Sequence, residues 1–71
     1  MEHYANVNVI SGVYAFELGD SWIMIQFKDG SIYRYSYEKA GMGYVEKMKK
    51  LAKSGRGLNS YILLNCRFLH D

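Results

Sequence analysis

The 71-residue chain contains no proline, one cysteine and only two histidines. A single cysteine excludes an intrachain disulfide, so stability must come from an apolar core. Cys66 and His70 have i,i+4 spacing, but two ligands are too few for a zinc site. His3 lies near the other terminus and adds no third ligand in sequence. We therefore expect neither a metal nor another cofactor.

Long apolar runs are also lacking. No stretch approaches the roughly 20 residues that a membrane-spanning helix needs. The first ten residues contain no basic start followed by an apolar run, so they do not read as a signal peptide. We expect a soluble, cytoplasmic protein without a membrane partner.

Motifs of catalysis are missing as well. The chain has no Ser-His-Asp set, no shared motif with paired carboxylates and no glycine-rich phosphate loop with a lysine. Gly41-x-Gly43 and Gly55-x-Gly57 are too short for a dinucleotide fingerprint. We expect no enzymatic activity.

What the chain does contain is apolar and aromatic residues, at 49% and 15% of the sequence. This composition predicts a single folded domain over residues 1–71. A chain of this size buries only about 60% of the surface that its unfolded form exposes. The core must therefore be well organised.

Residues 23–35 predict two strands joined by a turn at Phe27–Gly30. A type I turn that ends on a glycine at positive φ pairs Ile25 with Tyr33 and Ile23 with Tyr35. A two-residue turn at Asp29-Gly30 would shift the register by one residue and send both tyrosines to the opposite face. We prefer the first register because it produces one continuous apolar face.

A preceding strand over residues 13–18 is expected to join this hairpin through a two-residue turn at Gly19-Asp20. Phe16 then opposes Ile23, and Tyr14 opposes Ile25. The first face of the sheet, expected to be the core face, carries Tyr14, Phe16, Leu18, Ile23, Ile25, Phe27, Tyr33 and Tyr35. The second face carries Val13, Ala15, Glu17, Trp22, Met24, Gln26, Ile32, Arg34 and Ser36.

Helical periodicity begins after the strands. Residues 44–53 place an apolar stripe on one side, formed by Tyr44, Val45, Met48, Leu51 and Ala52. The helix should start between Glu38 and Met42 and end before Gly55, a natural C′ residue. On its polar side, Glu46 and Lys50 form a favourable i,i+4 pair.

Residues 58–64 fit either a short helix or a strand. We favour a helix with Asn59 as N-cap, which buries Tyr61, Ile62 and either Leu64 or Asn65. Residues 1–8 predict a flexible arm, or an edge strand through Val7 and Val9. The expected fold is α+β: a three-stranded antiparallel β-meander packed by one amphipathic helix, followed by a short second helical segment.

Charge is unevenly distributed. Residues 1–38 hold two basic and five acidic residues, for a net charge of −3, whereas residues 39–71 hold seven basic and two acidic residues, for +5. Five basic residues on the helix and just after it form a candidate nucleic-acid surface: Lys47, Lys49, Lys50, Lys53 and Arg56. The alternative is a solvated helix face that keeps a small domain soluble.

A second candidate surface lies on the second sheet face. Trp22, Met24, Ile32 and Arg34 combine an exposed apolar patch with a guanidinium, as the centres of protein interfaces do. This face is either open, and then a site for a protein partner or a second copy, or covered by residues 61–69. Tyr33 and Tyr35 could stack on bases, but we expect them to be core residues.

The spacing of these features resembles the KTSC domain, which occurs at the C-terminus of some lysyl-tRNA synthetases and as small stand-alone bacterial proteins. The resembling residues span 9–64: Val9-x-Ser11-Gly12-x-Tyr14, Ile23-x-Ile25-x-Phe27-x-x-Gly30-x-x-Tyr33-Arg34-Tyr35, Tyr44, Leu51-Ala52-x-Ser54 and Asn59-x-x-Ile62. Ala40-Gly41 replaces the family's proline, and the stretch 55–59 lacks its aromatics. The resemblance implies RNA binding by association. With the basic helix, it makes RNA the leading expected partner and a protein-interaction module the alternative.

Overall fold

A four-stranded sheet and a helical layer form the two halves of the fold in the computed structural model, which describes residues 1–6 and 12–71. The elements in chain order are β1 (Glu2–His3), β2 (Val13–Leu18), β3 (Trp22–Phe27), β4 (Ile32–Ser36), α1 (Met42–Ser54), α2 (Leu58–Tyr61) and the π-helical turn η1 (Ile62–Cys66). The sheet is antiparallel throughout, with the strands side by side in chain order. The α+β class is therefore as predicted.

The sequence predicts three strands, and the structure adds β1 as a fourth. Only two polar residues form it, which is too short for any periodicity to indicate. It is held by pairing with β2 and by Tyr4, whose backbone N–H donates to the Tyr14 carbonyl at 3.0 Å. The Tyr4 ring is buried, and its hydroxyl accepts a hydrogen bond from the Leu58 N–H at 3.1 Å. The expected pairing of Val7 and Val9 lies outside the described residues.

The β3–β4 hairpin has the predicted register. Ile25 pairs with Tyr33 and Ile23 with Tyr35. The Gly30 N–H donates to the Phe27 carbonyl at 2.9 Å, and Gly30 has φ 97°, a conformation that costs a residue without Cβ little. The turn and its glycine fix the register locally, so the local sequence was enough to predict it.

The predicted β2–β3 register is wrong by two residues. Phe16 pairs with Ile25 rather than Ile23, and the turn residues are Asp20 and Ser21. Gly19 is needed instead because the Trp22 indole packs against it. A Cβ on Gly19 would lie 2.0 Å from Cε2 of Trp22, so the indole occupies the space where a side chain would stand. An even shift leaves Phe16 on the core face.

A β-bulge between Val13 and Ala15 exchanges two predicted positions. Val13 pairs with Phe27 and is fully buried, whereas Tyr14 is 45% exposed and lies against the His3 ring at 4.9 Å. The predicted alternation places Tyr14 on the core face and Val13 on the opposite face. One extra residue in a strand inverts every position before it.

Helix α1 has the predicted bounds, but Tyr44, which the prediction placed on its apolar stripe, is 39% exposed. The helix begins at Met42 and ends before Gly55, which has φ 78° and donates its N–H to the carbonyls of Leu51 and Ala52. Its buried residues are Val45, Met48 and Ala52.

The second helical segment is a helix, as favoured, but its details differ. Gly57, with φ 81°, precedes the first turn in place of Asn59. Leu58, Ile62 and Cys66 are buried, whereas Leu64 is 82% exposed. Of the predicted buried residues, only Ile62 is fully buried. The wider π turn aligns positions four apart, so Cys66 lies on the line of Leu58 and Ile62.

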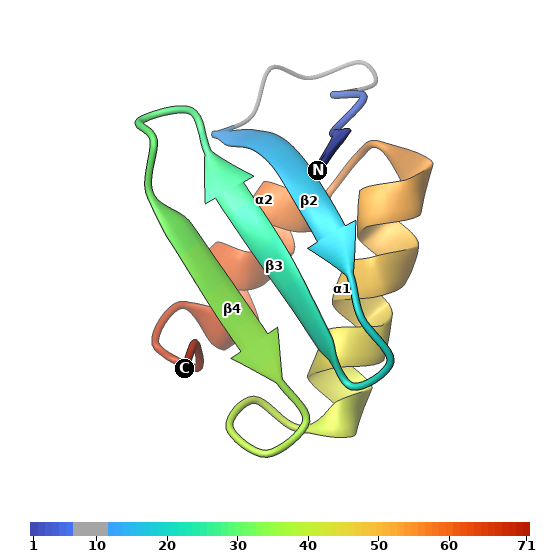
Figure 1. The fold of residues 1–71 in the computed structure, drawn as a ribbon, viewed down its shortest axis with the longest axis vertical. Coiled ribbons are helices and arrows are strands. Elements are labelled where there is room, and N and C mark those ends of the chain that lie inside the picture. The colour runs from blue at the N-terminus through green and yellow to red at the C-terminus, as the bar shows by residue number, and fades with distance from the viewer. Residues whose placement is uncertain (7–11) are drawn as a thin grey trace.

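Both helical segments lie behind the same face of the sheet, and the opposite face is turned toward the viewer in Figure 1. The core between the layers is formed mainly by Val13, Phe16, Ile23, Ile25, Tyr35, Val45, Met48, Leu58 and Ile62. Residues 61–69 therefore do not cover the second sheet face, and within residues 1–6 and 12–71 no helix or strand lies over it (Figure 1).

Candidate functional site

The outer side of α1 carries most of the predicted nucleic-acid surface. Lys47, Lys50 and Lys53 are exposed, and so is Arg56 just after the helix. Within residues 1–6 and 12–71, none of these four forms an ion pair. Four cations are therefore available to an anionic partner.

Lys49 differs from its neighbours because it is tied to the sheet. Only 13% of its side chain is exposed. Its ammonium donates to the Asp20 carbonyl at 3.0 Å and lies 2.9 Å from Oε2 of Glu46 and 5.6 Å from the centre of the Tyr37 ring. Lys49 thus joins α1 to the β2–β3 turn.

Glu46 is the centre of this contact. The expected partner was Lys50, but Glu46 is paired with Lys49 and accepts a hydrogen bond from the Tyr37 hydroxyl at 2.5 Å. The bond from Tyr37, and after it the one from Lys49, lowers the pKa of the Glu46 carboxyl. The same bond to Glu46 is the main cause that raises the pKa of Tyr37. Glu46 is therefore kept as an anion that neutralises Lys49 and leaves Lys50 free.

The second sheet face carries the predicted interface residues. Ile32 is 52% exposed, and Trp22 and Met24 are half-buried. The Trp22 indole folds back over Gly19. Arg34 lies across from Met24 on the neighbouring strand. The four predicted residues do share one open face.

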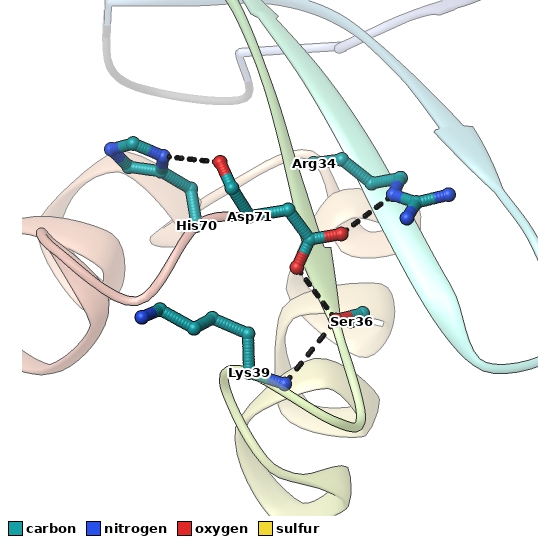
Figure 2. A network of polar contacts seen from close by, with 5 residues as sticks. All are labelled: Arg34, Ser36, Lys39, His70 and Asp71. Atoms are coloured by element: carbon teal, nitrogen blue, oxygen red, sulfur yellow. Dashed lines mark hydrogen bonds and ion pairs between the residues drawn. The ribbon is translucent and has the colours of Figure 1, made fainter.

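Arg34 is held by a contact that the sequence did not predict. Its Nε lies 2.7 Å from Oδ2 of Asp71, and the Ser36 hydroxyl donates to Oδ1 of Asp71 at 2.6 Å (Figure 2). The Asp71 backbone N–H donates to the Arg34 carbonyl at 2.7 Å. The hydrogen bond from Ser36, followed by that from Arg34, lowers the pKa of Asp71. The carboxylate of Asp71 thus neutralises part of the positive charge that Arg34 could offer to a binding partner.

A cleft of about 560 Å³ separates the β3–β4 turn from the C-terminal segment. Seven side chains with rings or positive charges line it: Phe27, Lys28, Tyr33, Tyr35, Arg67, Phe68 and His70. No sequence pattern predicted it, because Arg67, Phe68 and His70 follow the last expected element and meet β4 only in the folded chain.

The two tyrosines of β4 have different environments, and the prediction that both are core residues is wrong for Tyr33. Tyr35 is 1% exposed, and its burial, more than the nearby Cys66 and Tyr33, raises its pKa to about 12. Tyr33 is 38% exposed and packs against His70 with ring centres 4.5 Å apart. It lies nearer the hairpin turn and opens on the cleft.

The remaining candidates for chemistry are the Cys66 thiol and side chains that could bind a metal. Cys66 is fully buried, and this burial raises the pKa of its thiol, so it is protected from reagents. In the part of the chain that the structure describes, no three His, Cys, Asp or Glu side chains gather as a metal site. None of its helices is both long and apolar enough to cross a bilayer.

Comparisons of the chain with protein-family models, with curated proteins and with solved structures found no match. The resemblance to the KTSC domain therefore stays a prediction that rests on the residues quoted for it.

Proposed function

We propose that the protein is a non-catalytic module that binds RNA through the outer face of α1. The observation that carries the proposal is the row of Lys47, Lys50 and Lys53. These side chains are exposed and have no acidic partner among the described residues, whereas Lys49 of the same helix is tied to Glu46. Residues three apart on a helix are neighbours on its surface, so the three ammonium groups act together.

The expected binding is electrostatic and therefore salt-dependent. Three phosphate contacts to a single strand give a slope of log K against log salt of about −2. Raising the salt from about 50 to 200 mM should then weaken binding roughly 20-fold. Arg56 adds a fourth contact if the strand continues past the end of α1.

The test is fluorescence anisotropy with a labelled 12-nucleotide RNA. Lys47→Ala/Lys50→Ala/Lys53→Ala should abolish most of the salt slope, and the substitutions should not unfold α1 because alanine is the strongest helix former. Lys50→Ala compared with Lys39→Ala is the matched pair, since Lys39 is also exposed but lies before α1. Equal affinities of the wild type and the triple variant would refute the proposal.

A second function is favoured by the open sheet face. Trp22, Met24 and Ile32 lie on the sheet face opposite the buried Ile23 and Ile25, and Arg34 pairs with Met24, which suits a protein partner or a second copy. Ile32→Ser should reduce self-association in light scattering without harming the core, because Ile32 is 52% exposed. An unchanged mass for both proteins at every concentration would remove the homodimer from consideration.

A further inference from the structure

The cleft beside the β3–β4 turn offers rings to a ligand. Phe68 is 78% exposed, which is unusual for a phenylalanine in a small domain, and Tyr33 is 38% exposed. Tyr33 is fixed in place, with His70 on one side at 4.5 Å and Phe27 at 5.9 Å between ring centres. A rigid ring at the wall and an exposed ring at the rim are both surfaces on which a planar group can stack.

Two cations accompany these rings. Lys28 and Arg67 line the cleft and form no ion pair within the described residues. The Arg67 guanidinium carbon lies 5.3 Å from the centre of the Phe68 ring, so a charge and a stacking surface are presented together. A ligand that is planar at one end and anionic at the other matches this arrangement.

One acceptor completes the lining. The Asp29 carboxylate receives bonds from the Ser31 N–H at 2.9 Å and the Ser31 hydroxyl at 2.6 Å, and both end on Oδ1. Oδ2 has no partner among the described residues and remains available to a donor of the ligand. The two hydrogen bonds from Ser31 also lower the pKa of Asp29, which keeps the acceptor ionised.

We infer that this cleft binds one unstacked nucleobase and its phosphate, with the base against Tyr33 and Phe68 and the phosphate near Lys28 and Arg67. The inference rests on the proposed RNA binding and names a base site for it on a different part of the surface from α1. The free acceptor on Asp29 favours bases with an exocyclic amine, so adenine and cytosine should bind better than uracil. The volume of about 560 Å³ lies within the range of small-molecule sites.

The experiment compares oligo-A, oligo-C and oligo-U of eight nucleotides in anisotropy titrations. Phe68→Ala should weaken binding of oligo-A about 5- to 150-fold, the range found for loss of one base–aromatic stack. Leu64→Ala is the matched control, because Leu64 is 82% exposed on the same C-terminal segment but does not line the cleft. Asp29→Asn should reduce the preference for oligo-A over oligo-U.

Two results would overturn the inference. Equal affinities of Phe68→Ala and Leu64→Ala, while the triple lysine variant of α1 loses binding, would leave RNA binding intact without a base site here. Amide shifts on RNA addition that spare Lys28, Ser31 and Arg67 in NMR spectra would do the same.

An AMP titration followed by the same amide shifts separates the sources of the ligand. Shifts with AMP but no binding of any oligonucleotide would identify a free nucleotide as the ligand and refute the proposed function alone. If neither AMP nor an oligonucleotide binds the wild-type chain, both proposals are wrong.

Discussion

Replacing Gly19 with alanine tests the packing of the chain's single tryptophan. An added Cβ would lie 2.0 Å from Cε2 of Trp22, 2.2 Å from Nε1 and 2.5 Å from Cδ2. Ordinary contacts begin at 3.4 Å, so the ring must retreat by about 1.4 Å or leave. Overpacking of this kind costs typically about 1–3 kcal/mol.

The effect should be visible in two measurements. A loss of about 2 kcal/mol lowers the melting temperature of a domain of this size by roughly 8–16 °C. The emission of Trp22 should also shift to longer wavelength as the indole moves into water. Gly43→Ala is the control, because nothing beyond the helix backbone around it lies within 4 Å of its Cβ position, and it should raise the melting temperature. A Gly19→Ala protein with wild-type emission and melting temperature would refute this account of the turn.

Three further outcomes are expected. Burial raises the pKa of Tyr35 from 10 to about 12, so the contribution of Tyr35 to stability is complete below pH 10 and is lost as the pH rises toward 12. The free energy of unfolding, measured by denaturation across this range, should decline, and Tyr35→Phe should reduce that decline. The pKa of Asp71 is lowered, so its contribution is present above the ordinary value of 3.8 and is lost as the pH falls through the folded value. In NMR titrations, Ser36→Ala and Arg34→Ala should each raise the Asp71 midpoint, because each removes a hydrogen bond that lowers the pKa of Asp71; a midpoint unchanged in both variants would contradict this. Cys66 should react with a thiol reagent only in denaturant, and rapid labelling of the native protein would show that its burial is wrong.

The sequence predicted those parts of the fold that local chemistry determines. Gly30 sets the β3–β4 register through its own positive φ, and Gly55 ends α1 in the same way. The β2–β3 register failed because Gly19 resembles a turn residue, whereas its role is to make room for Trp22, a contact that forms only after the strands pair. The bulge before Ala15 leaves no mark in the alternation of residue types.

The candidate sites also divide into residues that the local sequence predicts and residues that only the folded chain brings together. The lysines of α1 were predictable because helical periodicity alone gathers them on one side. Lys49 was not separable from them, since its partner Asp20 is 29 residues away. The cleft required Tyr33 to meet Phe68 and His70, which no local pattern brings together.

Asp71 has a consequence for the behaviour of the protein at high concentration. β4 is the outermost strand on its side of the sheet, and the Arg34 carbonyl that Asp71 binds belongs to the row of main-chain groups that β3 does not use. Such rows recruit strands of other molecules, and proteins protect them with charge or a covering segment. At Arg34, Asp71 provides both a charge and a covering segment. Loss of its charge in acid would uncover β4 beside the exposed Ile32, and aggregation by strand addition should begin there.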